Sequence, residues 1–241
     1  TFGRKELSWQ ELRSQVASVA SSFSEMGVGN GDRVVAVLPN TEVALIAFLA
    51  TASLGAIWSL CAPDMGHVAI VDRFHQIKPK ILIAQDGYVH AGKTIDRCDV
   101  IVTIRSRLRS VEHFIAVPVV GETAPSDKNW KDLIDQKVKF KPTPVPFNHP
   151  LWVVYSSGTT GTPKPIVHGH GGIIIEGMKQ SLHQDLTSFD RFCWLTSSGW
   201  IMWNSQWVAL GQGATVVAFD GAPNYPDMSR IWEFVSTEKL T

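Results

Sequence analysis

Residues 151–164 read Leu-Trp-Val-Val-Tyr-Ser-Ser-Gly-Thr-Thr-Gly-Thr-Pro-Lys, and this stretch decides how the fold is interpreted. Its first four residues are apolar, which predicts a short buried strand before a loop rich in hydroxyl side chains. Gly158 and Gly161 allow positive φ angles, so successive backbone N–H groups can turn inward and form an anion-binding concavity. The hydroxyl groups add donors, and Lys164 adds a positive charge. The stretch therefore predicts a loop that holds a polyphosphate.

This loop differs from a Walker A loop, because no Gly-Lys-Ser/Thr follows its glycines at the required spacing. Pro163 and Pro165 lack N–H donors and favour extended neighbours, so the prediction is strand, loop, strand rather than strand, loop, helix. Hydroxyl groups in turns also bond to their own backbone, which leaves open which of them would touch phosphate. The candidate phosphate-binding residues are Ser156, Ser157, Gly158, Thr159, Thr160, Gly161, Thr162 and Lys164.

The composition is that of an ordinary globular protein. The 241 residues include 22 basic and 22 acidic side chains, so no overall field favours nucleic acid or an anionic membrane. The cysteines at 61, 98 and 193 are widely spaced, which argues against a zinc site or a disulfide framework and favours a reducing, cytoplasmic location. We predict neither a membrane span nor a signal peptide. The chain starts without a methionine, and we expect it to be a segment of a longer protein.

Helical and strand patterns alternate along the first part of the chain. A capping box at Ser8 and Glu11 starts a helix with an apolar stripe, which ends at Gly27. This alternation predicts an α/β fold of parallel βαβ units, in which helices cover the sheet. The expected strands are 34–38, 56–60, 81–84, 100–104, 151–154, 191–195 and 215–219, and the expected helices after the first are 41–54, 68–77, 173–186 and 228–235.

The pattern weakens over residues 105–149, where charged residues and the run Pro142-Thr-Pro-Val-Pro146 suggest a variable surface connection. We therefore divide the chain into a first α/β subdomain at 1–146 and a second α/β subdomain at 147–241. The second subdomain would contain the phosphate loop.

The run from Tyr155 to Lys164 resembles the phosphate-binding signature of the adenylate-forming enzymes, which include acyl-CoA ligases, luciferases and peptide-synthetase adenylation domains. The continuation from Pro165 to Gly172 narrows the resemblance to the acetyl-CoA-synthetase branch, and the similarity covers nearly the whole chain. Pro165 departs from the family, where most members have glycine. The resemblance implies the fold of the large N-terminal domain, with ATP, Mg²⁺ and CoA as ligands.

The resemblance also implies roles for individual residues. Lys164 would contact the β- and γ-phosphates of ATP, and Arg73 would reach a phosphate of CoA, although a surface ion pair explains Arg73 equally well. Trp200, Ile201 and Met202 would line the acid site, whereas physical reasoning alone favours core packing for them. Ile201 and Met202 depart from the acetate-type pattern, and they suit a small, mostly apolar acyl chain.

Other motifs have simpler interpretations. The stretch 219–226 resembles a family segment near the acyl and nucleotide sites, although a turn before a helix is the plainer explanation. His168 and His170 could form a metal pair, but no third ligand is evident nearby. The glycine-rich run 27–31 precedes a strand, so it predicts a turn rather than a dinucleotide loop.

The expected function is therefore AMP-forming ligation of a small acid, with acetoacetate preferred, to CoA through an acyl-adenylate. Acetate, propionate and butyrate stay open as alternative acids. A shortened, non-catalytic binding module is the alternative of a different class. The family's later Tyr-Gly-x-Thr-Glu segment, its ribose-binding aspartate and its C-terminal lysine do not occur in the sequence, so we expect these 241 residues alone to be inactive.

Overall fold

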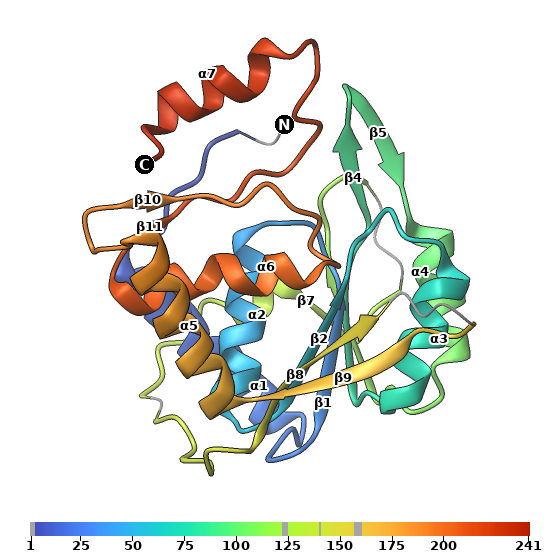
Figure 1. The fold of residues 1–241 in the computed structure, drawn as a ribbon. Helices are drawn as coiled ribbons and strands as arrows, with labels where there is room; N and C mark the ends of the chain where they lie inside the picture. The colour runs from blue at the N-terminus through green and yellow to red at the C-terminus, as the bar shows by residue number, and fades with distance from the viewer. Residues whose placement is uncertain (1–2, 122–124, 140, 157–160) are drawn as a thin grey trace.

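The computed structural model describes residues 3–121, 125–139, 141–156 and 161–241 (Figure 1). Within these ranges a seven-stranded sheet has the order β7-β6-β3-β1-β2-β8-β9. Neighbouring strands pair in parallel, except that β8 and β9 are antiparallel. The strands are β1 (Arg33–Val37), β2 (Ile57–Cys61), β3 (Ile81–Gln85), β6 (His113–Val117), β7 (Lys128–Asn129), β8 (Pro150–Ser156) and β9 (Lys164–Gly169).

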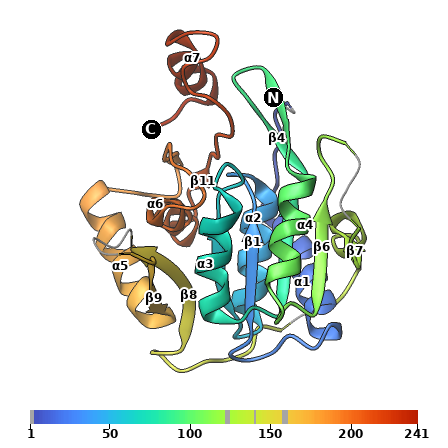
Figure 2. The ribbon, with the colours of Figure 1, turned by 90° about the vertical axis from the view of Figure 1, so that its right-hand side faces the viewer.

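Helices cover both faces of this sheet, which gives the predicted α/β fold (Figure 2). The first pair, α1 (Trp9–Glu25) and α2 (Glu42–Ser53), packs on one face, and α3 (His67–Ile77) and α4 (Cys98–Arg107) pack on the other. No helix in the described ranges is both long enough and apolar enough to span a membrane. The remaining helices are η1 (Trp130–Leu133), α5 (His170–Gln184), α6 (Ile201–Gln206), η2 (Trp207–Gln212) and α7 (Ser229–Glu238).

Two short strand pairs lie beside the main sheet. The hairpin of β4 (Gly87–His90) and β5 (Lys93–Asp96) is antiparallel, whereas β10 (Arg191–Phe192) and β11 (Thr215–Val216) pair in parallel. The strand predictions at 191–195 and 215–219 are thus right in type but too long.

The core follows from the alternation of side chains along buried parallel strands. In β1, Val34 and Ala36 pack in the cluster that includes α1 and α2, whereas Val35 and Val37 pack in the cluster on the α3 and α4 side. Because both faces are covered, β1 is almost uniformly apolar. The helix α1 begins as predicted, since the Glu11 N–H donates to Ser8 Oγ (3.2 Å) and the Ser8 N–H donates to Glu11 Oε2 (2.7 Å).

The prediction of a strand at 100–104 is wrong, because this segment lies within α4. Ile101 and Ile104 are buried while Val102 is 49% exposed, which is the three-residue spacing of a helix. A short apolar run cannot be assigned from its periodicity alone. The surface connection predicted at 105–149 is also wrong in part, since it contains the buried strand β6. Charged residues before β6 and Pro118 after it hid this strand in the sequence.

The main sheet continues across the predicted subdomain boundary. Trp152 of β8 pairs with Trp58 of β2, so the strand before the phosphate loop extends the sheet formed by residues 33–129. The division at residue 147 stays a prediction.

Asp86, at the end of β3, fixes the chain that leaves β6. Its side chain is buried, and its Oδ1 accepts from the N–H groups of Val119 (2.8 Å) and Val120 (3.1 Å), while Oδ2 accepts from Gly121 (3.1 Å). An asparagine would offer one acceptor oxygen without a charge. We expect Asp86→Asn to lower the free energy of unfolding by about 1–2 kcal/mol, the difference between charge-assisted and neutral hydrogen bonds. Urea denaturation checks this, and an unchanged midpoint would show that these bonds contribute nothing.

Candidate functional site

The glycine- and hydroxyl-rich loop joins β8 to β9, which confirms the predicted order of strand, loop, strand. The two strands are antiparallel, and Ser156 at the end of β8 lies opposite Lys164 at the start of β9. Gly161 has a φ of 136°, a value that side chains disfavour, so its lack of a Cβ is used here. The candidates Ser157, Gly158, Thr159 and Thr160 lie outside the described residues.

Helix α3 holds both strands at the base of this loop. The Tyr155 hydroxyl donates to the backbone carbonyl of Arg73 (2.8 Å), and the Gln76 side chain donates to the carbonyl of Pro163 (2.9 Å). Burial raises the pKa of Tyr155, so its phenol stays protonated and keeps donating. These contacts fix the loop ends against a rigid helix.

The described loop residues suit an anionic ligand. Gly161, Thr162 and Lys164 are exposed, whereas Ser156 is half-buried. Lys164 begins β9, and β9 pairs with β8 at six positions between Pro150 and Ser156. The strand fixes the Lys164 backbone, so only its flexible side chain has to order when the ammonium meets a phosphate.

A narrow pocket of about 10 Å³, room for about one water molecule, lies beside the loop, between the β2–β8 part of the sheet, α3 and the segment before α6. Arg73 and Tyr155 line it from one side, and Gly199 and Trp200 line it from the other. The structure therefore brings together two regions that the sequence analysis treated separately. Other lining residues are Trp58, Leu60, Val153, Val154, Ser198 and Asn204.

The segment before α6 approaches the sheet closely. A Cβ at Gly199 would lie 2.9 Å from the backbone nitrogen of Ala62, so glycine is needed for this approach. Trp200 is 63% exposed at the pocket. Ile201 and Met202 begin α6 and, within the described chain, are not among the residues that line the pocket.

Arg73 makes two local contacts, and its predicted contact with a CoA phosphate stays a prediction. Its guanidinium donates to the Ala69 carbonyl (2.8 Å) and lies 5.8 Å from the centre of the Tyr155 ring. Arg73 is half-buried and lines the pocket, so it places a positive charge there, near the base of the loop.

The two candidate histidines belong to different surroundings. His168 lies in β9, with its ring 6.2 Å from the Trp152 ring, whereas His170 starts α5 with its ring 5.8 Å from His149. Burial, and then the neighbouring His149, lower the pKa of His170. Among the described residues, no cluster of His, Cys, Asp and Glu could hold a metal ion.

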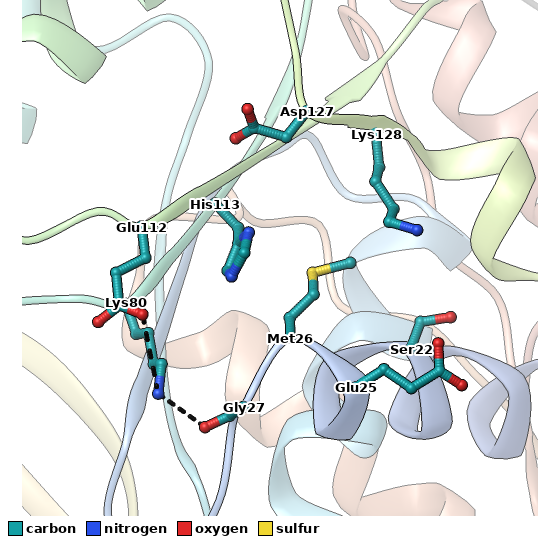
Figure 3. A pocket seen from close by; sticks show the side chains of 9 residues that line it. All are labelled: Ser22, Glu25, Met26, Gly27, Lys80, Glu112, His113, Asp127 and Lys128. Atoms are coloured by element: carbon teal, nitrogen blue, oxygen red, sulfur yellow. Dashed lines mark hydrogen bonds and ion pairs between the residues drawn. The ribbon is translucent and has the colours of Figure 1, made fainter.

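A larger hollow lies at the opposite edge of the sheet, near the amino ends of β3 and β6 (Figure 3). Two lysines line it, Lys80 and Lys128. Lys80 is already engaged, since its ammonium donates to the Gly27 carbonyl (2.7 Å) and lies 3.6 Å from Asp32 and 3.9 Å from Glu112. Ligands of open parallel sheets bind at the carboxyl ends of the strands. The loop and its pocket are therefore the candidate site.

Asp220 adds a titratable group near this end of the sheet. Burial raises the pKa of its carboxyl to about 6. The unfolded pKa is about 3.9, so the folded state binds the proton more tightly and stability falls as pH rises between these values. We expect the free energy of unfolding to fall by at most about 3 kcal/mol from pH 4 to pH 6 through this group. Chemical denaturation at both pH values should show a smaller fall in Asp220→Asn, and an identical fall would contradict the assignment.

Sequence reasoning missed Asn40, a buried residue three positions after the end of β1. Its side chain contacts α6 and the Phe219 carbonyl. A polar residue just after a buried parallel strand was the available signal, because functional residues gather at the carboxyl ends of such strands.

Fold and site together define an α/β protein with a glycine- and hydroxyl-rich loop at the carboxyl ends of its parallel strands. A family model described as "AMP-binding enzyme" matches residues 1–241. The chain belongs to this family of AMP-binding enzymes.

Several proteins that are similar to this chain are named acetoacetyl-CoA synthetase. It is 39% identical to acetoacetyl-coenzyme A synthetase of Rhizobium meliloti over 97% of the chain, and 37% identical to acetoacetyl-CoA synthetase of Gallus gallus over 99%. A solved structure of acetoacetyl-CoA synthetase from Streptomyces lividans matches the whole chain with a TM-score of 0.97 and 43% identity. The chain spans 37% of the first of these proteins and 38% of the other two.

Proposed function

We propose that the complete protein is an ATP-dependent acid–thiol ligase that converts acetoacetate and CoA to acetoacetyl-CoA, releasing AMP and pyrophosphate. The observation that carries this proposal is the loop between β8 and β9, where Lys164 begins β9 opposite Ser156 and the Gly199 segment lies nearby. The names of the similar proteins supply the acid. The predicted cytosolic location stays part of the proposal.

The first step would transfer AMP to the acid. A carboxylate oxygen of the acid attacks the α-phosphorus of ATP, the bond to the bridging oxygen breaks, and pyrophosphate leaves. Lys164 would stabilise the charge that develops on the leaving phosphates, and Ser156 and Thr162 would donate hydrogen bonds. The contacts between α3 and the loop ends would keep these groups in place, so catalysis would depend on positioning.

The second step would form the thioester. The CoA sulfur attacks the acyl carbon, the bond from that carbon to the AMP oxygen breaks, and the thiol proton is released. Arg73 would attract a CoA phosphate, since its half-buried guanidinium lies at the same pocket. Trp200 would cover the acyl group, while Ile201 and Met202 would shape the acid site from the start of α6.

The residues present also fit the proposed use of Mg²⁺. Mg²⁺ prefers oxygen ligands and is usually held through substrate phosphates and few protein groups, and Ser156 and Thr162 carry hydroxyl oxygens beside the loop. When bound, this ion would neutralise phosphate charge, and Lys164 would add a fixed charge beside it.

Incubation of the protein expressed from its complete coding sequence with ATP, CoA and each acid tests this function. We expect acetoacetyl-CoA and AMP to form in equal amounts, with acetate, propionate and butyrate used less efficiently. Preference for one of those acids would overturn the choice of acetoacetate. No thioester with any acid, despite binding of ATP, would favour the non-catalytic binding module.

A further inference from the structure

The buried amide of Asn40 connects segments of the chain that are distant in sequence. Its Oδ1 accepts hydrogen bonds from Trp203 Nε1 (3.1 Å) and Gln206 Nε2 (2.8 Å), both on α6. Its Nδ2 donates to the Phe219 carbonyl (3.3 Å). Asn40 lies three residues beyond the end of β1, so this amide joins the segment that leaves a central strand to α6 and to the segment containing Asp220.

The side chains that bond to Asn40 are buried and closely packed. Asn40 is 5% exposed, and Trp203 and Gln206 are fully buried. Trp203 and Gln206 lie three residues apart and so present their donors on one face of α6. The Trp203 ring packs edge-on against Phe48 of α2, with ring centres 6.3 Å apart, and against Trp207 at 5.4 Å.

A second contact fixes the chain just before α6. The Ser198 hydroxyl donates to the Leu38 carbonyl, so the end of β1 holds both the start and the body of this segment. Between these contacts lie Gly199 and Trp200, which line the pocket, and then Ile201 and Met202. A shift of α6 would therefore move all the residues assigned to the acid.

We infer that Asn40 is a positioning residue that sets the acid selectivity of the site by fixing α6 against the end of β1. This inference rests on the proposed function. The Asn40 amide does not line the pocket in the described chain, so its effect would pass through Trp203, Gln206 and the Phe219 carbonyl. Losing it leaves two buried donors and an acceptor unpaired, and α6 would move to satisfy them.

The kinetic test compares Asn40→Ala with the unchanged protein, each expressed from the complete coding sequence. We expect the kcat/KM ratio of acetoacetate to butyrate to change by about tenfold or more, because small misplacements of a site have effects of this size. The KM for ATP should stay within about threefold, since the loop is held by α3 instead. Trp203→Phe removes one donor but keeps an aromatic ring, so it should shift the ratio in the same direction by a smaller factor.

Ser18→Ala is the matched control. Ser18 is also fully buried and bridges distant segments, donating to the Leu133 carbonyl and accepting from the Gln136 N–H (2.9 Å), but it lies on α1. This variant should lose stability without changing the acid ratio. An unchanged ratio in both Asn40→Ala and Trp203→Phe, or the same change in Ser18→Ala, would overturn the inference.

Hydrogen exchange keeps the inference testable without activity. In Asn40→Ala the α6 amides should exchange about tenfold faster relative to those of α3, and Ser18→Ala should leave this ratio unchanged. If the unchanged protein ligates no acid, the proposed function fails, while equal α6 protection in Asn40→Ala would refute positioning by Asn40. Activity with altered exchange but an unaltered acid ratio would refute the selectivity role alone.

Discussion

Replacing Lys164 with alanine is expected to lower the rate of acid-dependent ATP–pyrophosphate exchange by about 10²–10³-fold. Removing one preorganised stabiliser of transition-state charge costs about 2.7–4 kcal/mol of barrier. Lys164 begins β9 opposite Ser156, so its backbone is fixed while its side chain stays exposed to a ligand. The measurement is the exchange rate at saturating acid, in the protein expressed from its complete coding sequence.

Two further variants separate charge from structure. Lys164→Arg keeps the positive charge and should retain more activity than Lys164→Ala. Lys179 is an exposed lysine on α5 that pairs with Glu176, so Lys179→Ala should leave the exchange rate unchanged. An unaltered rate in Lys164→Ala would remove Lys164 from the site.

Truncation of Trp58 should have the largest effect on stability. Trp58 is 1% exposed in the central strand β2, where it pairs with Val34 and Trp152 and packs 6.3 Å from the Phe48 ring. We expect Trp58→Ala to cost about 3–5 kcal/mol, because the rigid sheet cannot close the cavity left behind. Urea denaturation followed by circular dichroism measures this loss.

Comparison with two other variants tests the cause. Trp58 Nε1 is buried without a hydrogen-bond partner in the described chain, so Trp58→Phe loses no polar contact and should cost much less than Trp58→Ala. Trp232 of α7 is 70% exposed, and Trp232→Ala should change stability by less than about 0.5 kcal/mol. Equal losses in Trp58→Ala and Trp232→Ala would contradict the cavity argument.

The sequence predicted the fold well where local signals agreed. The capping box at Ser8 and Glu11, the turn glycines and the apolar run 34–38 all favoured the same βαβ arrangement that the structure has. The sequence-based prediction failed at α4. Residues 100–104 are four apolar residues and one threonine, a short run that fits either a helix or a strand. Which strands become neighbours is decided by packing over long distances, so the position of β8 beside β2 was not predictable from the pattern.

The candidate site was only partly predictable for a related reason. The loop containing Lys164 is a continuous stretch, so its composition indicated a phosphate ligand directly. The pocket depends on α3 and the Gly199 segment meeting the end of β8, and these residues are far apart in sequence. Asn40 has no motif, since its importance comes from Trp203 and Gln206, which lie 163 and 166 residues away.

We propose that the loop and the residues around it serve the adenylation of a small acid. Acid-dependent ATP–pyrophosphate exchange by the protein expressed from its complete coding sequence tests this most directly, because exchange reports the first step without CoA. We predict exchange that requires an acid and is fastest with acetoacetate among acetoacetate, acetate, propionate and butyrate. No exchange with any of these acids would contradict the account.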